Sequence, residues 1–144
     1  MNAFETLLNC YRTLRFDALR PFLTDDCDYS SIWVLEVLHG ADKTINLLNR
    51  IGRNCRENHP EMKMYAWPVR LLEYTCDDAI RVVQDFPDRQ NSILICLEMR
   101  EEKISGIWIT ADDFFAYRPS LPPEDILSEN AYRSILRKRP MQGV

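Results

Sequence analysis

The chain has 144 residues, a length that suits one domain, and its hydrophobic share of 46% is enough to build one core. Charged residues make up 28% and the formal net charge is −4. This composition excludes a disordered chain, and it argues against a general nucleic-acid binder, which needs a basic face to neutralise phosphates. We therefore predict a single globular domain over residues 1–144 with no nucleic-acid partner.

The cysteines and the apolar runs indicate the compartment. The five cysteines, at positions 10, 27, 55, 76 and 96, are odd in number and form no CxxC pair, so we expect reduced thiols. The first residues contain Glu5 and no uninterrupted apolar stretch, so they do not form a signal peptide. No run approaches the roughly 20 apolar residues that span a bilayer. We predict a cytoplasmic protein without membrane association.

The N-terminal half predicts three helices around one strand. Asn2 and Glu5 have the spacing of a capping box, and apolar residues follow at helical spacing, which predicts a helix over 3–14. Asp17 caps a second, shorter helix. Residues 24–26 are expected to form a turn, and the β-branched and aromatic residues of 27–38 one strand. After Gly40 a third amphipathic helix runs to about residue 55, followed by a polar loop over 54–60.

The C-terminal half predicts antiparallel strands and a final helix. Strands are expected over 64–74 and 79–86, and Pro68 places the first at an edge or a bulge. Residues 91–113 predict a β-hairpin. With Glu101 and Glu102 as a two-residue turn, Ile95 faces Trp108, although a slipped register stays open because Glu-Glu is a poor turn sequence. Pro123 begins a helix over about 123–139, with an apolar stripe of Leu127, Ala131 and Ile135 and a basic end.

Three segments together resemble the NTF2-like superfamily, which includes ketosteroid isomerase, scytalone dehydratase and SnoaL-type cyclases. LRPFLTDDCDYSSIWV is similar to its opening of a helix, two acids and a strand. LHGADKTINLLNRI is similar to its glycine followed by an amphipathic helix, and EEKISGIWITADD to its closing hairpin. The likeness covers residues 3–118. It implies an α+β, cystatin-like cone, in which a curved antiparallel sheet wraps around N-terminal helices, with the 123–139 helix appended. It also implies a homodimer.

The isomerase branch of that superfamily can be compared residue by residue. Its members use an aspartate on the first long strand as general base and a tyrosine on the first helix to hold the oxyanion. Aligning their acid pair on Asp25 and Asp26 places Ser31 at the base position and Tyr11 near the tyrosine. A serine cannot replace a carboxylate as general base near neutral pH, which counts against isomerase chemistry of that type.

Aromatic residues are the main site candidates. The cavity implied by the resemblance is expected to be lined by Tyr11, Tyr29, Ser31, Trp33, Trp67 and Trp108. The same aromatics could instead be core or dimer-interface residues. We assign no catalytic residue; Asp113, at the end of the hairpin, and Tyr11 are the candidates if catalysis occurs, with Tyr29 beside them. His39 and His59 have no close partner for a metal site, and four glycines are too few for a phosphate loop, so we expect no metal and no cofactor.

Three functions remain open at this point. The first is a non-catalytic module that binds a small apolar ligand or a protein. The second is a cofactor-free isomerase or dehydratase acting on a small organic substrate. The third is an adaptor or immunity-type protein that binds a partner through its sheet and its C-terminal helix. A cavity with a carboxylate or histidine in it indicates the enzyme; an apolar cavity without one indicates the ligand binder.

Overall fold

The computed structural model describes residues 1–31, 34–71, 78–111 and 117–118. The chain begins with α1 (Ala3–Thr13), the 3-10 helix η1 (Asp17–Phe22), β1 (Leu23–Ser31), β2 (Val34–His39) and α2 (Ala41–Asn58). It continues with β3 (Lys63–Leu71), β4 (Asp78–Asp85), β5 (Gln90–Arg100), β6 (Lys103–Ala111) and β7 (Tyr117–Arg118). The expected C-terminal helix over 123–139 lies outside the described residues.

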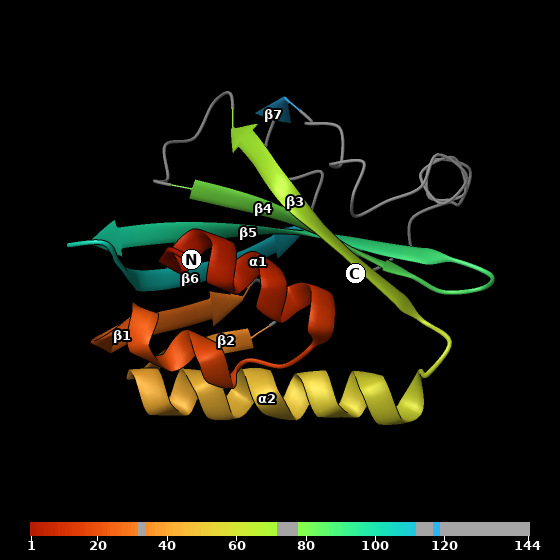
Figure 1. Cartoon of the computed structure of the whole chain (residues 1–144), viewed down its shortest axis with the longest axis horizontal. Coiled ribbons are helices and arrows are strands. Elements are labelled where there is room, and N and C mark those ends of the chain that lie inside the picture. The colour runs from red at the N-terminus through yellow and green to blue at the C-terminus, as the bar shows by residue number, and fades with distance from the viewer. Residues whose placement is uncertain (32–33, 72–77, 112–116, 119–144) are drawn as a thin grey trace.

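The strands form one curved sheet in the order β2-β1-β6-β5-β4-β3-β7 (Figure 1). The helices α1 and α2 lie on the same side of it. Neighbouring strands are antiparallel except β1 and β6, which are parallel, so the sheet is mixed rather than wholly antiparallel. The predicted α+β class, with a bent sheet and helices on its concave side, is confirmed.

Helix α1 begins and ends as its sequence predicts. The Asn2 side chain accepts a hydrogen bond from the Glu5 N–H, and the Glu5 carboxylate accepts one from the Asn2 N–H. At its C-terminus Leu14 takes the left-handed conformation, with φ of 58°, and closes the last turn. The Arg12 guanidinium then donates two hydrogen bonds, of 3.1 and 2.9 Å, to the carbonyl oxygen of Ala66 on β3. This contact fixes the helix across the sheet.

Two predictions for residues 24–38 are wrong. The expected turn at 24–26 is the first part of β1, where Asp25 and Asp26 are exposed and pair with Arg20 and Arg100. Acids that face water next to arginines fit a strand as well as a turn. The expected single strand 27–38 is a pair of antiparallel strands, in which Ser31 lies opposite Val34. The β-rich composition predicted strand correctly, but it carried no signal for the reversal between β1 and β2.

Helix α2 is longer than predicted and includes most of the expected loop 54–60. It begins after Gly40, which has a φ of 108°. Glycine adopts this backbone conformation readily, whereas a residue with a Cβ would be strained in it. It passes through Gly52 because the helix there lies against the Leu14 carbonyl, where an added Cβ would overlap the oxygen. The Arg56 side chain donates a hydrogen bond to the same carbonyl. Contact with the end of α1 thus extends α2 beyond its apolar pattern.

The β5–β6 hairpin has the predicted turn and a different register. Glu101 and Glu102 form the two-residue connection with φ of 52° and 67°, and Arg100 faces Lys103. A bulge between Glu98 and Met99 then shifts the pairing by one residue. Ile95 therefore faces Ile109, and Cys96 faces Trp108. Since a shift of one residue reverses the face of every side chain, the bulge moves Trp108 to the opposite side of the sheet.

The two faces of the sheet have different surroundings. The inner face packs against both helices, and its buried residues include Ile80, Val82, Ile95, Leu97 and Ile107, all members of the main core cluster. The outer face is the opposite side. Its residues alternate with the inner ones along each strand and form no part of that cluster. Pro68 pairs with Ile80 of β4, and within the described residues β7 pairs with β3 only at Arg70 and Leu71, so Pro68 lies at an open edge there, as predicted.

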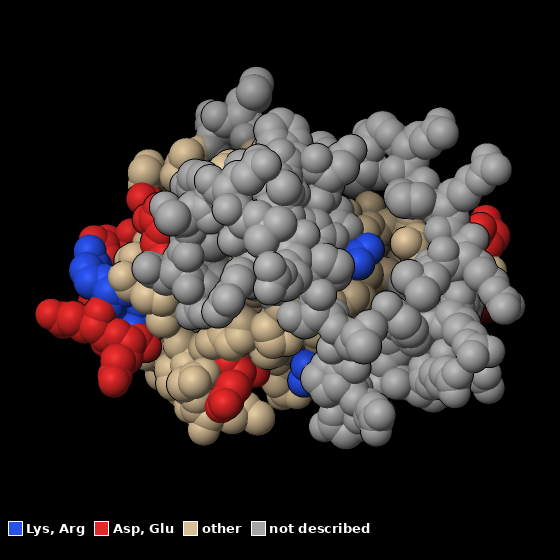
Figure 2. Space-filling view, turned by 90° about the horizontal axis from the view of Figure 1, so that it is seen from above, with Lys and Arg blue, Asp and Glu red and all other residues tan. Residues whose placement is uncertain are grey.

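The acidic side chains of the described residues are spread unevenly over the surface. Seen from above, the largest group of described acidic side chains lies at the end of the molecule where β5 turns into β6 (Figure 2). Among the helices of the described ranges, none combines the length and the apolar character required to cross a bilayer. Within the same ranges, no three His, Cys, Asp or Glu side chains gather as ligands for a metal ion.

Candidate functional site

A hollow of about 300 Å³ lies between α2 and the inner face of the sheet. Its helical wall comes from Leu14 and Phe16 after α1 and from one face of α2, namely Leu47, Leu48, Ile51 and Cys55. Its sheet wall includes Met64, Val82, Ile93 and Ile109. Ile51 is 43% exposed and marks the border with solvent. We call this hollow the inner cavity.

Two phenols bring polar groups into this apolar surface. Tyr11 on α1 is 6% exposed and packs edge-on against Phe16, with ring centroids 5.0 Å apart. Among the described residues, its hydroxyl is a buried group without a hydrogen-bond partner. Burial, with Tyr29 and Cys10 nearby, raises its pKa well above the ordinary value, and burial raises the pKa of Tyr29 to about 12. Both phenols are therefore neutral donors at physiological pH.

A chain of polar side chains lies elsewhere on the cavity wall. The Asn91 amide donates to the Gln84 carbonyl oxygen at 2.7 Å, and the Gln84 amide donates to the Cys55 sulfur at 3.8 Å. Burial raises the pKa of the Cys55 thiol, although the hydrogen bond from Gln84 acts against it. A thiol kept protonated is a weak nucleophile, so this group does not resemble an activated cysteine.

The described cavity wall holds no carboxylate and no imidazole. Its polar groups are phenols, amides, a thiol and the Ser31 hydroxyl, none of which is a strong base near neutral pH. Such a wall can desolvate an apolar molecule and donate hydrogen bonds to it. Proton abstraction would require a group from outside the described part of the wall.

The structure brings together three of the six residues that the sequence suggested for the cavity. Tyr11, Tyr29 and Ser31 line it. Trp67 and Trp108 do not, which corrects that expectation: both lie on the outer face, Trp67 because of strand alternation and Trp108 because of the bulge at Glu98–Met99. Trp33 and the catalytic candidate Asp113 lie outside the described residues. His39 pairs with Asp28 on the outer-face side and is not among the residues that line the cavity.

Sequence reasoning missed two polar residues of the cavity wall. Gln84 and Asn91 face each other on β4 and β5. Each lies two positions from Val82 or Ile93 and therefore on the same inner face. A polar residue at an otherwise apolar position of a strand was the available signal. It was overlooked because both residues flank the loop between the strands, where polar residues are ordinary.

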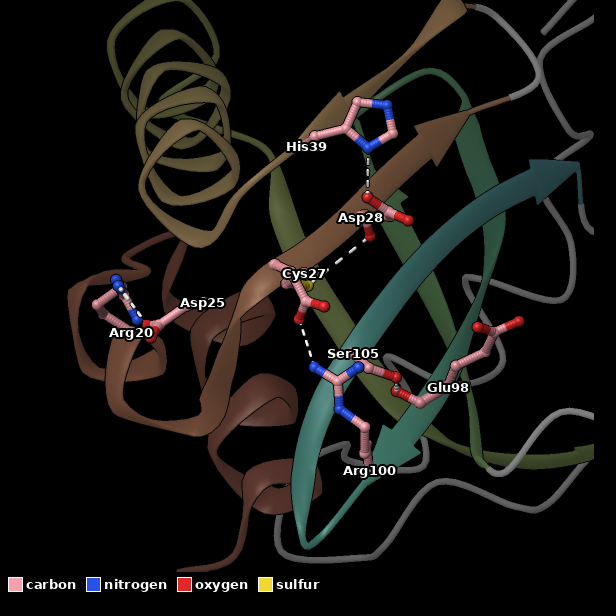
Figure 3. Close-up of polar contacts among 9 residues, drawn as sticks. Arg20, Asp25, Cys27, Asp28, His39, Glu98, Arg100 and Ser105 are labelled. Carbon is pink, nitrogen blue, oxygen red and sulfur yellow. Dashed lines mark hydrogen bonds and ion pairs between the residues drawn. The ribbon is translucent and has the colours of Figure 1, made fainter.

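A second hollow, of about 250 Å³, lies on the outer face. His39, Asp28, Gly106 and Glu98 form a row across β2, β1, β6 and β5. The hollow forms at Gly106, where an added Cβ would come within 3.3 Å of a Glu98 carboxylate oxygen. Figure 3 shows Asp28 beside His39, whose Nδ1 lies 2.6 Å from Asp28 Oδ1, with Glu98 two strands away. Trp108 lines the same hollow, which we call the acidic hollow.

Comparison with known proteins adds information on the fold. No family model matches the sequence, and no curated protein matches it in sequence. Many solved structures are similar in three dimensions. An LEH-like epoxide hydrolase from M. tuberculosis superposes with a TM-score of 0.53 and 16% identity, over 94% of this chain and 87% of that one. A protein of cystatin-like fold from Silicibacter pomeroyi superposes with a TM-score of 0.58 and 10% identity, over 93% of this chain and 79% of that one. An NTF2-like protein from Anabaena variabilis superposes with a TM-score of 0.55 and 14% identity, over 79% of this chain and 84% of that one.

The chain has the NTF2-like, cystatin-like fold. The fold suspected from three short segments is thereby confirmed, with the N-terminal helices and the curved sheet in place. At these identities the likeness is one of fold. NTF2-like folds host unrelated functions, so the function has to be argued from the cavity itself.

Proposed function

We propose that this protein binds a small, mainly apolar organic molecule in the inner cavity without converting it. The ligand carries a hydrogen-bond acceptor, such as a carbonyl oxygen, that meets the Tyr11 hydroxyl. The observation that supports the proposal is the buried Tyr11 hydroxyl without a partner among the described residues, on the wall of an apolar cavity. A buried donor without a partner is unfavourable by roughly 1–3 kcal/mol, and a bound acceptor removes that penalty.

The size and chemistry of the cavity restrict the ligand. A hollow of about 300 Å³ suits a molecule of one or two fused rings rather than a long chain. The neutral phenols provide no cation to hold an anionic group, so the ligand is uncharged where it meets Tyr11 and Tyr29. The described part of the cavity wall holds no carboxylate or imidazole that could act as a base, and this supports binding over catalysis.

Matched probe molecules test this proposal. 2-Acetonaphthone has a flat apolar body and a carbonyl acceptor, whereas 2-ethylnaphthalene has nearly the same shape without the acceptor. We expect equilibrium dialysis to show that the ketone binds about tenfold more tightly, since one hydrogen bond contributes about 1.4 kcal/mol. Tyr11→Phe should abolish the difference and leave the binding of the hydrocarbon unchanged.

A cavity-filling variant serves as the second arm. Ile93→Trp should remove binding of both probes, whereas Val37→Trp, at a position 45% exposed outside the cavity, should leave both unchanged. Equal affinity for ketone and hydrocarbon in the unmodified protein would refute the role of Tyr11. Unchanged binding in Ile93→Trp would refute the cavity as the site.

The other functions suggested by the sequence stay predictions. An isomerase or dehydratase would need a base such as Asp113, which lies outside the described residues. An adaptor or immunity-type role and a homodimer each require a partner surface, and the inner cavity provides no argument for either.

A further inference from the structure

The sheet wall of the inner cavity carries polar groups at two separate ends. Ser31 on β1 lies opposite Ile109 of β6, and Ile109 lies opposite Ile95 of β5. Asn91 lies on β5 four residues before Ile95, a distance of about 13 Å at roughly 3.3 Å per residue. Ile93 lies between them on the same face, so an apolar stretch of the wall separates the two polar ends.

The end with the phenols is closed. Tyr29 lies opposite Ile107, which places it farther from Asn91 than Ser31 is. Tyr29 is 5% exposed and Tyr11 is 6% exposed. Burial and, after it, the electrostatic interaction with Tyr29 raise the pKa of Tyr11, so the two phenols are neighbours at this end.

The end with the amides is open. Gln84 on β4 lies opposite Asn91, and its amide donates to the sulfur of Cys55 on α2 at 3.8 Å. These three residues are half-buried, and Ile51, one helical turn before Cys55, is 43% exposed. A ligand therefore enters past the amides, and the end that it inserts first reaches the phenols.

We infer that the ligand carries a hydroxyl group at the end opposite its carbonyl, and that Gln84 and Asn91 bind this hydroxyl at the open end of the cavity. The inference rests on the proposed function, in which Tyr11 binds the carbonyl. It narrows the ligand to a hydroxy-ketone whose two oxygens lie at opposite ends of an apolar body.

The two amides offer one donor and one acceptor side by side. Asn91 donates to Gln84 Oε1 at 2.7 Å, which holds the pair together. Within the described residues, Asn91 Oδ1 accepts no hydrogen bond, and Gln84 Nε2 makes only its long contact with sulfur, a weak acceptor. A hydroxyl is the smallest group that uses both atoms, because its oxygen accepts from Nε2 while its hydrogen is donated to Oδ1.

Groups that offer only one of these functions fit the pair less well. A carbonyl or an ether accepts from Gln84 and leaves Asn91 Oδ1 without a donor. An apolar end removes the water from both amides and gives them no partner, which is unfavourable. An ammonium group finds no carboxylate on the described cavity wall. The amide pair therefore selects a neutral hydroxyl.

Three naphthyl ketones test the inference by equilibrium dialysis. 2-Acetonaphthone has the carbonyl alone, 6-hydroxy-2-acetonaphthone adds the hydroxyl at the far end of the rings, and 6-methoxy-2-acetonaphthone replaces that donor by an ether. We expect the hydroxy-ketone to bind about tenfold more tightly than the parent ketone, and the methoxy-ketone to bind no more tightly than the parent. Equal affinity for the hydroxy-ketone and the parent would overturn the inference.

A double variant assigns the effect to the amides. Gln84→Met combined with Asn91→Leu should abolish the preference for the hydroxy-ketone. The preference for 2-acetonaphthone over 2-ethylnaphthalene should persist, because it depends on Tyr11, and its persistence shows that the variant is folded. The control, Asn9→Leu combined with Asn54→Leu, removes two exposed amides outside the cavity and should keep both preferences. A hydroxy-ketone preference that survives in the Gln84/Asn91 variant would refute the role of the amides.

The inference and the proposed function fail in different ways. If 2-acetonaphthone binds with its Tyr11-dependent preference and the hydroxyl adds nothing, the proposed function stands and the second polar end is refuted. If none of the three ketones binds, the proposed function is refuted and the inference with it.

Alkylation of Cys55 locates the hydroxyl without any substitution, in case the double variant does not fold. The thiol contacts Gln84, so a hydroxyl bound there covers it. With the cavity saturated, 6-hydroxy-2-acetonaphthone should slow iodoacetamide labelling of Cys55 severalfold more than 2-acetonaphthone does, as measured by mass spectrometry. Cys27, 0% exposed in the core, should stay unlabelled throughout and reports that the protein remains folded. Equal protection of Cys55 by the two ketones would place the hydroxyl elsewhere and refute the inference.

Discussion

At the scale of single residues, Gly52 is the position where sequence and structure give opposite predictions. In an isolated helix, Gly→Ala stabilises by about 1 kcal/mol, since glycine is the weaker helix former. In this fold a Cβ at position 52 would overlap the Leu14 carbonyl oxygen and press on the Phe16 ring. The close approach of α2 to the end of α1 therefore requires glycine.

We expect Gly52→Ala to lower the free energy of unfolding by about 2 kcal/mol, the usual effect of overpacking a closely packed contact. Urea unfolding followed by circular dichroism measures it. The neighbouring Arg53→Ala, at an exposed position of the same helix, should change stability by less than about 0.5 kcal/mol. A stabilised Gly52→Ala protein would show that helix propensity outweighs the contact.

At the scale of the element, the β5–β6 hairpin carries local strain in its turn. Glu101 and Glu102 both have positive φ, at 52° and 67°, where residues with a Cβ are disfavoured. Asn-Gly is the pair that fits such a turn. Glu101→Asn with Glu102→Gly should therefore raise the free energy of unfolding by about 1 kcal/mol.

The control for the turn is Glu101→Gln with Glu102→Gln. It removes the same two charges but keeps long side chains at positive φ, so thermal unfolding should change little. Equal stabilisation by the two variants would assign the effect to charge at the acidic end of the molecule (Figure 2), not to the backbone.

At the scale of the whole molecule, buried thiol and phenol groups make the free energy of unfolding depend on pH in the alkaline range. Burial raises the pKa of Cys10 to about 11 and, with help from Asp28 and Asp26, that of Cys27 to about 12. Burial also raises the pKa of the Tyr29 phenol to about 12. A group whose pKa is raised on folding contributes its full stability below the unfolded pKa and loses it as pH rises through the folded pKa.

We therefore expect the free energy of unfolding to be constant near pH 8 and to fall from about pH 9, where unfolded thiols ionise, toward pH 12. Each group lowers stability by up to about 1.4 kcal/mol per pH unit within its own window. Urea unfolding at pH 8, 9, 10 and 11 checks this, and Cys27→Ala should flatten the fall. Equal stability at pH 8 and pH 11 would contradict the burial of these groups.

The sequence by itself determined the elements whose signals are local. The capping box of Asn2 and Glu5, the two-residue turn at Glu101–Glu102 and the edge position of Pro68 follow from neighbouring residues, and each is present. Tyr11 and Tyr29 on the cavity wall were also named in advance, through the resemblance to the NTF2-like superfamily.

Only the tertiary structure decided which face each tryptophan occupies and where the helices end. The bulge at Glu98–Met99 reverses Trp108, and contact with the Leu14 carbonyl carries α2 through Gly52 to Asn58. The parallel pairing of β1 with β6 joins residues about 80 positions apart, such as Leu23 and Ile104. Local residue patterns encode propensity and periodicity, whereas register and face depend on packing between distant segments, which no short window of sequence contains.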